Sequence, residues 1–336
     1  MPSARLRTRL EPAGESAIAE AAACIRRGGL VAMPTETVYG LAADATSGLA
    51  VARVFAAKGR PAFNPLIAHV LDLKEARGHG RFSQEAGILA EAFWPGPLTL
   101  VLPVTADCGV CLLARAGQDT VALRAPAHET ARSLIQAAGR PLAAPSANRS
   151  GGVSPTTAAH VLADLDGKID WILDGGPSDY GLESTIVACL DADPALLRPG
   201  AVTREAIETA LGRRLGPAAP RGAPNAPGQL KSHYAPRARL RLDAREAAPD
   251  EAALDFGGAL SNCPSVARLD LSPTRDLAEA AANLFAHLRT LDEAGARCIA
   301  VAPVPRNGLG AAINDRLERA AAPRDPATPA GKSPAH

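Results

Sequence analysis

Short apolar runs recur along the first two-thirds of the chain, separated by stretches in which apolar residues return at helical spacing. The runs Leu30–Met33, Leu66–Val70 and Leu98–Leu102 are mostly apolar and have the length of a strand. Between the first two, the apolar residues of 51–55 fall on one face of a helix. This pattern predicts buried strands separated by amphipathic helices.

The same pattern continues as far as residue 212. Further strands are predicted at 120–124, 142–144, 170–174, 184–189 and 195–198, and helices at 127–138 and 204–211. Residues 1–14 lack periodicity and are expected to form a loose arm or an edge strand. Because strands and helices do not alternate strictly, we expect an α/β domain with a twisted, mixed sheet over residues 12–212.

Helix ends carry recognisable signals. Ser16, Ser83 and Thr203 each precede a helical pattern and can cap it. Ser154 followed by Pro155 is a further start signal, since proline is favoured at the first helical position.

A second unit follows a segment rich in proline and glycine. We assign residues 213–236 to a linker and lid, and 237–321 to a small α/β domain of Rossmann-like, parallel-sheet type. Its helices are expected at 276–290 and 309–320. The glycines near 308 lack the spacing of a dinucleotide fingerprint, so NAD binding is not expected. Residues 322–336 read as a disordered tail.

Charge and cysteine content narrow the class of protein. The formal net charge is +1, so no global field directs the chain to nucleic acid or membranes. Of the six cysteines, only Cys108 and Cys111 have metal or redox spacing, and no second half-site accompanies them. No signal peptide or membrane-length apolar run appears, so we expect a soluble protein of a reducing compartment, the cytoplasm.

Polar residues cluster where the predicted elements end. Lys58, Arg60 and Asn64 follow a helix, where they either bind an anion or only offset the helix dipole. Ser146 lies in the turn 145–148, and Ser154 at a helix start, where each has an ordinary structural role as well.

Two arginines and a histidine in predicted strands could likewise either bind an anion or have only a structural role. Arg124 and Arg198 follow apolar strand residues, where a cation is costly without an anionic partner. His69 ends another strand, and the segment 183–185 precedes a fourth. The chain lacks P-loop, kinase and hydrolase motifs and shows no carboxylate pair. These features favour a site that positions anions, as phosphoryl or nucleotidyl transfer requires.

Seven motifs occur in order: PTETVYGL, KGRPAFNPLIAH, WPGPLTLVL, VALRAP, APSAN, ESTIV and LRPG. Together they closely resemble the YrdC-like domain of threonylcarbamoyl-AMP synthases. The downstream APGQLKSHYAP and the small α/β domain resemble the two-domain form of that family. The resemblance covers about residues 15–320.

The resemblance implies a nucleotidyltransferase reaction. L-threonine, bicarbonate and ATP would give L-threonylcarbamoyl-AMP and pyrophosphate, by carboxylation of the threonine amine and attack of the carbamate on the α-phosphate. The product would feed t6A37 modification of tRNA through a downstream tRNA threonylcarbamoyltransferase, with an RNA contact as a further option. Mg²⁺ would arrive with ATP, because the sequence shows no dedicated carboxylate cage.

The family's residue roles carry over to matching positions. L-threonine binding is implied for Thr35, His69, Arg124, Ala144 and Ser184. ATP binding is implied for Lys58, Arg60, Asn64, Thr120, Ser146, Ser154, Arg198 and Tyr234, with Lys58 and Arg60 as the catalytic residues. Relatives often carry Met-Lys-Tyr-Arg before His-Tyr, whereas residues 229–232 here are Gln-Leu-Lys-Ser, which removes one cation and one aromatic ring.

Two other functions share parts of this pattern. One is a non-catalytic, RNA-binding YrdC-like module, which the near-neutral charge disfavours. The other is carbamoyl transfer of the hydrogenase-maturation type, which the absence of an acylphosphatase-like domain and of clustered zinc-finger cysteines disfavours.

Overall fold

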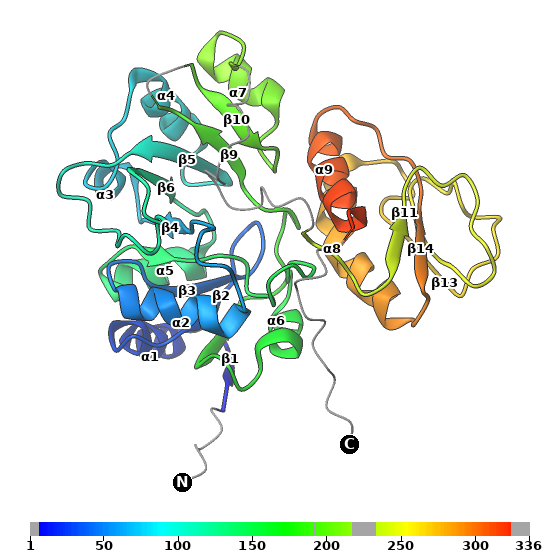
Figure 1. The fold of residues 1–336 in the computed structure, drawn as a ribbon, viewed down its shortest axis with the longest axis horizontal. Helices are drawn as coiled ribbons and strands as arrows, with labels where there is room; N and C mark the ends of the chain where they lie inside the picture. The colour runs from blue at the N-terminus through cyan, green and yellow to red at the C-terminus, as the bar shows by residue number, and fades with distance from the viewer. Residues whose placement is uncertain (1–6, 191–192, 217–232, 324–336) are drawn as a thin grey trace.

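The computed structural model describes residues 7–190, 193–216 and 233–323. Most of the predicted linker, including residues 229–232, and nearly all of the predicted tail lie outside these ranges. The described chain forms a larger sheet domain and a smaller one that lie side by side (Figure 1).

A ten-stranded mixed sheet is the centre of the larger domain. Its spatial order is β1-β8-β2-β3-β7-β4-β6-β5-β9-β10. The strands are β1 (Arg9–Pro12), β2 (Val31–Met33), β3 (Gly40–Asp44), β4 (Ile67–His69), β5 (Leu98–Pro103), β6 (Thr120–Arg124), β7 (Leu142–Ala143), β8 (Trp171–Asp174), β9 (Thr185–Ala188) and β10 (Ala195–Arg198). Parallel and antiparallel pairs occur together, as in β4 with β6 and β5 with β6, so the predicted mixed sheet is confirmed. β1 lies at the edge, one of the two arrangements expected for residues 1–14.

Helices cover both faces of this sheet. They are α1 (Glu15–Arg26), α2 (Gly48–Lys58), α3 (Leu73–Arg77), α4 (Gln84–Phe93), α5 (Glu129–Ala138), α6 (Ala158–Leu165) and α7 (Arg204–Leu211). Neighbouring residues of a strand point to opposite faces. Ala32 accordingly belongs to the apolar cluster that includes α2, α4 and α6, whereas Val31 and Met33 belong to the cluster that includes α1 and α5. Both faces are therefore buried, which explains why the strands are apolar throughout.

Local expectations failed at a few elements. The segment 40–44 forms β3, although no strand was predicted there. α1 starts after Gly14, so Ser16 lies inside its first turn and does not cap it. The helix predicted at Ser154 starts later, at Ala158, because the Thr157 hydroxyl accepts the capping hydrogen bond from His160 N. Ser83 and Thr203 cap α4 and α7 as predicted.

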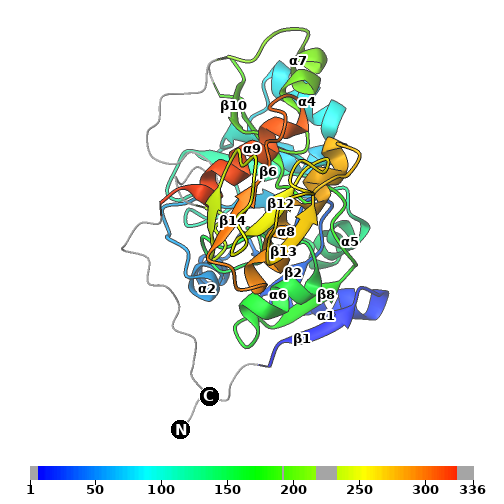
Figure 2. The ribbon, with the colours of Figure 1, turned by 90° about the vertical axis from the view of Figure 1, so that its right-hand side faces the viewer.

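The smaller domain contains a four-stranded sheet, in which every pair is parallel, and two helices. Its order is β11-β14-β12-β13, which confirms the predicted parallel α/β type. The elements are β11 (Arg239–Arg241), β12 (Ala252–Asp255), β13 (Ala267–Asp270), α8 (Leu277–Glu293), β14 (Cys298–Val301) and α9 (Leu309–Ala321). Figure 2 faces this sheet, and α9 lies between it and the larger domain's β10 region.

The two domains share a buried interface. Val38, Val153 and Leu182 of the larger domain belong to the same apolar cluster as Leu284 and Phe285 of α8. Arg289 of the same helix pairs with Asp164 of α6 at 2.7 Å. Apolar burial and this ion pair thus hold α8 against the larger domain. None of the helices in the described part of the chain is long and apolar enough to cross a membrane.

Candidate active site

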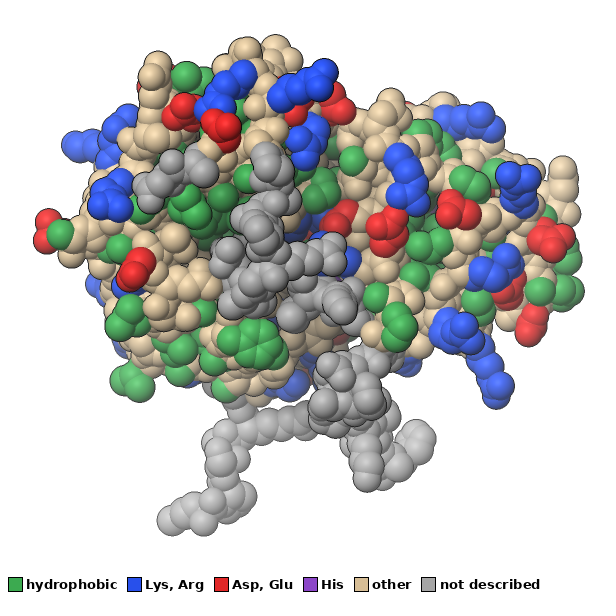
Figure 3. Space-filling view, turned by 45° about the horizontal axis from the view of Figure 1, so that its top comes forward, with side chains coloured by type: hydrophobic (Ala, Val, Ile, Leu, Met, Phe, Trp, Pro, Cys, Tyr) green, Lys and Arg blue, Asp and Glu red, His purple; other side chains and the backbone are tan. Residues whose placement is uncertain are grey.

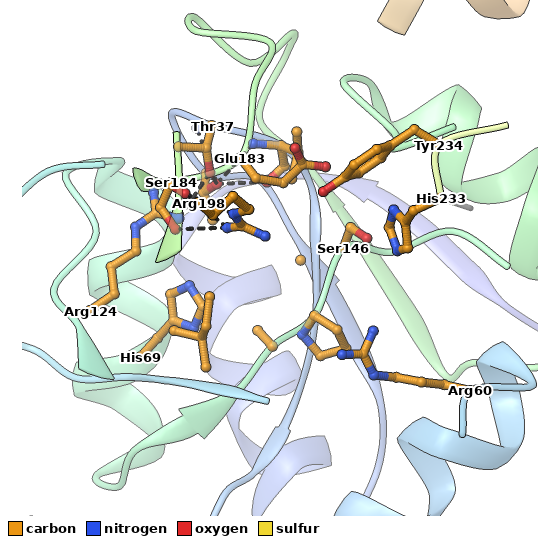
Figure 4. A pocket seen from close by; sticks show the side chains of 16 residues that line it. Thr37, Arg60, His69, Arg124, Ser146, Glu183, Ser184, Arg198, His233 and Tyr234 are labelled. Carbon is orange, nitrogen blue, oxygen red and sulfur yellow. Dashed lines mark hydrogen bonds between the residues drawn. The ribbon is translucent and has the colours of Figure 1, made fainter. Parts of the chain in front are cut away.

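A pocket lies where several strand ends of the larger sheet meet the start of the smaller domain (Figure 4). It is lined by Thr35, Thr37, Val38, Gly40, Arg60, Ile67, His69, Arg124, Ala144, Pro145, Ser146, Glu183, Ser184, Arg198, His233 and Tyr234. Sheet register explains part of this gathering. β4 and β6 are parallel with His69 opposite Arg124, so both side chains arrive at the same edge.

Most of the residues predicted for the site reach this pocket. They are Thr35, Arg60, His69, Arg124, Ala144, Ser146, Ser184, Arg198 and Tyr234. Four predicted ATP-binding residues, Lys58, Asn64, Thr120 and Ser154, are not part of its lining.

Lys58 lies behind the pocket wall. Its Nζ donates to the carbonyl oxygen of Ser146 at 2.6 Å and to that of Asn148. Burial, and then the charge of Arg60, lower the pKa of Lys58 well below its usual value. In this geometry Lys58 holds the 145–148 turn in place and presents Ser146 to the pocket.

The other three residues outside the lining have different surroundings. Thr120 begins β6, at the opposite end of that strand from Arg124, and donates to the Gln118 side chain at 3.2 Å. Ser154 donates to Glu183 at 2.5 Å. Asn64 is buried, and its amide has no hydrogen-bond partner among the described residues.

One end of the pocket is built around Arg124. Its Nη2 donates to Glu36 Oε1 at 2.6 Å, and its Nη1 donates to Thr37 Oγ1 at 2.9 Å. Thr35 and Thr37 share a hydrogen bond of 2.8 Å. Burial raises the pKa of Glu36, but the charge and hydrogen bond of Arg124 outweigh it, so the pKa is lowered. Glu36 therefore stays ionised and fixes the guanidinium.

His69 forms the wall beside Arg124. It is buried, and its Nδ1 has no hydrogen-bond partner among the described residues. Burial and then the charge of Arg124 lower the pKa of His69 to about 3. The imidazole is therefore neutral near pH 7, and it can hydrogen-bond a polar ligand without adding charge.

The other end of the pocket is cationic. Arg60 donates to the carbonyl oxygens of Asn64 at 3.4 Å and Pro65 at 3.1 Å, and no ion pair joins it to a described carboxylate. Burial lowers the pKa of Arg60 to about 10, so it remains charged. Arg198 donates to the carbonyl oxygen of Ser184 at 2.9 Å and to its hydroxyl at 3.2 Å. Arg198 is buried and Arg60 is partly buried. Cations in such places, whose contacts include neutral oxygens, suit an anionic ligand.

Tyr234 covers this end. Its ring stacks on Phe285 at 5.5 Å, and the His233 ring meets it edge-on at 4.0 Å. Only 1% of Tyr234 is exposed, and its hydroxyl has no partner among the described residues. Figure 4 shows the hydroxyl directed across the pocket mouth, toward Glu183. The predicted role of Tyr234 as a cover over the nucleotide fits this placement.

Three polar lining side chains were not among the predicted site residues: Thr37, Glu183 and His233. Glu36, which pairs with Arg124 but is not part of the lining, was not predicted either. All four lie within the motifs that carry the family resemblance. Glu36, Glu183 and His233 each adjoin a predicted ligand contact in the sequence, so a signal for them was available. In the described residues no group of three or more His, Cys, Asp and Glu side chains is arranged to hold a metal ion.

A mixed-sheet domain, a small parallel-sheet domain and a buried pocket lined by arginines define a two-domain α/β protein that holds small anionic molecules. Residues 23–200 match the family model Sua5/YciO/YrdC, described as "Telomere recombination", and residues 202–322 match "Threonylcarbamoyl-AMP synthase, C-terminal domain". The chain belongs to the threonylcarbamoyl-AMP synthase family.

Full-length relatives carry the same name. The chain is 40% identical to the threonylcarbamoyl-AMP synthase of Bacillus subtilis, with 91% of this chain and 93% of the relative aligned. It is 42% identical to that of Pyrococcus abyssi, over 89% and 92%. The crystal structure of P. abyssi Sua5 complexed with L-threonine has a TM-score of 0.84 at 39% identity and covers 94% of this chain and 97% of that one.

Proposed function

We propose that the chain is an L-threonylcarbamoyladenylate synthase. It condenses L-threonine, bicarbonate and ATP into L-threonylcarbamoyl-AMP and pyrophosphate. The observation that carries this proposal is the pocket itself, which has a single arginine held by a carboxylate at one end and two further arginines at the other, one buried and one partly buried. The first end suits an amino acid, and the second suits a polyphosphate.

L-threonine binds at the Arg124 end. The guanidinium pairs with the substrate carboxylate, using the N–H groups left over from Glu36 and Thr37. The remaining predicted contacts to L-threonine are Thr35, His69, Ala144 and Ser184, all of which line the pocket. Because His69 is neutral, Arg124 is the cation that recognises the carboxylate at this end.

ATP and bicarbonate bind at the other end. Arg60 and Arg198 face the phosphates, and Tyr234 covers the nucleotide. Ser146 lines the same end, with its hydroxyl donating to Asn148 Oδ1 at 2.6 Å. Lys58 and Ser154 act through neighbours, by holding Ser146 and Glu183 respectively. Asn64 adjoins Arg60 and offers an amide with no other partner among the described residues. For Thr120 the geometry gives no support, since it lies at the far end of β6.

The reaction proceeds in two balanced steps. The amine nitrogen of threonine attacks the carbon of bicarbonate, and loss of a proton and of water leaves a carbamate. A carbamate oxygen then attacks the α-phosphorus of ATP, and the bond to the bridging oxygen breaks as pyrophosphate leaves. Arg60 and Arg198 stabilise the charge that develops on the phosphates, while Lys58 holds the turn that presents Ser146. Catalysis thus consists mainly of positioning and electrostatics.

Mg²⁺ enters with ATP as part of the substrate. Glu183, the carboxylate of the pocket lining, is engaged by Arg316, and Glu36 beside the pocket is engaged by Arg124. Phosphate oxygens and water therefore supply most of the ion's ligands, as is usual for Mg²⁺ with nucleotides.

The product is consumed in the cytoplasm by a tRNA threonylcarbamoyltransferase that forms t6A37. An RNA-binding module without catalysis is the other function considered. On the face drawn in Figure 3, basic and acidic side chains are interspersed and no broad basic surface appears, so that face does not favour it.

A substrate-omission assay tests the proposal. Purified protein is incubated with labelled ATP, and pyrophosphate and the adenylate product are measured with each of threonine, bicarbonate and ATP withheld in turn. Both products should form only when all three are present. Pyrophosphate release that does not depend on threonine would exclude this activity. Tight, salt-dependent RNA binding without turnover would favour the RNA-binding module.

A further inference from the structure

Arg316 of α9 reaches out of the smaller domain into the larger one. Its side chain is fully buried, with Nε 2.8 Å from Glu183 Oε2 and Nη1 2.9 Å from the carbonyl oxygen of Pro199. Nη1 also donates to Asp315 at 2.7 Å. One guanidinium from the second domain thus binds two separate segments of the first.

Each of these segments carries a residue of the pocket. Glu183 immediately precedes Ser184, and Pro199 immediately follows Arg198. The segments also pack backbone to backbone at Gly200, where an added Cβ would lie 2.4 Å from Thr185 N and 2.5 Å from Glu183 O. Arg198 bonds to Ser184 across the same junction. A shift of either segment would therefore move Ser184 and Arg198 relative to each other.

Both members of the pair are charged. Burial raises the pKa of Glu183, but the charges of Arg316 and then Arg198 outweigh it, so the pKa is lowered. Burial lowers the pKa of Arg316, but Tyr234 and the carboxylates of Glu183 and Asp315 outweigh this effect, so the pKa is raised. Removal of one partner of a buried ion pair leaves the other charge buried and uncompensated. The contact is therefore strongly favoured once both groups are buried.

Arg316 also contacts the cover of the pocket. Its guanidinium carbon lies 5.3 Å from the centroid of the Tyr234 ring, within the range of a cation–π contact. Arg316 is not itself part of the pocket lining. It acts on the pocket through Glu183, Pro199 and Tyr234.

We propose that Arg316 is a positioning residue for the reaction, and that this is what the smaller domain contributes to the site. It sets the spacing between Ser184, on the threonine side, and Arg198, on the nucleotide side, and it supports Tyr234. This inference rests on the proposed function. A planar fork with several N–H donors is required, because three oxygens in different directions are bound at once.

Three variants test this role. Arg316→Met keeps much of the volume and removes the fork, and Arg316→Lys keeps the charge. Arg306→Met is the matched control, because Arg306 lies in the same domain and forms only an exposed ion pair with Glu318. Melting temperatures are recorded first, and kinetics are measured well below the lowest of them.

Arg316→Met should lower kcat/KM by about a hundredfold, because displacement of reacting groups by an ångström has that order of effect. Arg316→Lys should recover only part of this loss, and Arg306→Met should match the unaltered protein. The double variant Glu183→Gln, Arg316→Met should have a kcat/KM only slightly below that of Arg316→Met, because both substitutions remove the same ion pair.

Binding without turnover separates this inference from the proposed function. Calorimetric titration with L-threonine alone and with a non-hydrolysable ATP analogue should show weaker binding to Arg316→Met than to the control. Folded Arg316→Met with unaltered affinities and kinetics would overturn the positioning role. If the unaltered protein makes no adenylate, the proposed function fails, while the binding titrations still decide the role of Arg316. If Arg316→Met does not fold, Arg316→Lys is decisive: unaltered affinities and kinetics there overturn the role.

Discussion

Arg124 and Glu36 form an ion pair of 2.6 Å inside the pocket wall, where their side chains are only 4% and 5% exposed. The pair joins the end of β6 to the loop after β2, two parts of the sheet that are not neighbouring strands. It holds the guanidinium rigid for an incoming carboxylate, and it also compensates a charge that would otherwise be buried alone.

Glu36→Gln should therefore destabilise the fold. It leaves the Arg124 charge buried beside a neutral amide, and removal of one partner of a buried pair costs about 3 kcal/mol. Urea unfolding measures this loss. Glu318→Gln, which breaks the exposed pair with Arg306, should cost less than about 1 kcal/mol.

The double variant Glu36→Gln, Arg124→Met checks the cause. It removes both charges, so part of the lost stability should return, while threonine binding should be lost because Arg124 is replaced. If the double variant is less stable than Glu36→Gln alone, the uncompensated charge is not the source of the effect.

Arg60→Met should separate activity from stability. Arg60 has no ion-pair partner among the described residues, so its removal takes away a partly buried, unpaired charge and should leave the melting temperature unchanged or raised. Pyrophosphate release should fall by about a hundredfold or more, because charge stabilisation on the phosphates is lost. Unchanged kcat/KM would remove Arg60 from the site.

The sequence predicted the main strands well because they are buried on both faces and therefore read as continuous apolar runs. It failed at β3 (Gly40–Asp44), which begins with a glycine and contains two alanines, so that its strand propensity and its apolar periodicity were both weak. It also failed at Ser154, whose hydroxyl binds Glu183 and leaves the helix cap to Thr157. Tertiary partners decided both of these details.

The pocket was predictable where a polar residue ends a strand, as at His69 and Arg124. Arg316 was not found, although a signal existed. It falls between Ile313 and Leu317 on the apolar stripe of its helix, where an arginine requires a buried anion. That anion, Glu183, lies in another domain, and no local pattern shows how the two domains dock.

The protonation of His69 should make stability depend on pH. Its pKa is about 3 in the folded protein, against about 6.5 in an unfolded chain. Between these values the unfolded chain binds a proton that the folded protein does not, so stability falls as the pH drops from about 6.5 towards 3. His69 contributes a slope of up to about 1.4 kcal/mol per pH unit in that window.

His69→Gln should flatten this dependence, which urea unfolding between pH 7 and 4 measures. His160→Gln is the control, because burial likewise lowers the pKa of His160, to about 4, at a position outside the pocket. Both variants should flatten the profile, but only His69→Gln should weaken threonine binding. An unaltered slope in His69→Gln would mean that folding does not lower the pKa of His69.

Gly181 tests the docking of the two domains. Its φ is +62°, and an added Cβ would lie 2.5 Å from the carbonyl oxygen of Ala282 and 2.6 Å from that of Ala281, both in α8. Gly181→Ala should therefore force α8 away from the larger domain and, because Tyr234 stacks on Phe285 of α8, displace Tyr234 from the pocket. We expect a lower melting temperature and a fall in kcat/KM.

Gly176→Ala supplies the matched control for that substitution. Gly176 also has a positive φ, +83°, but nothing lies within 4 Å of its added Cβ. The variant should lose only about 1 kcal/mol of stability, the cost of a positive φ for a residue with a Cβ, and kcat/KM should be unchanged. The excess loss in Gly181→Ala, measured by urea unfolding, then reports the contact with α8. Equal losses in the two variants, with equal kcat/KM, would show that close docking of α8 at Gly181 is not needed for the reaction.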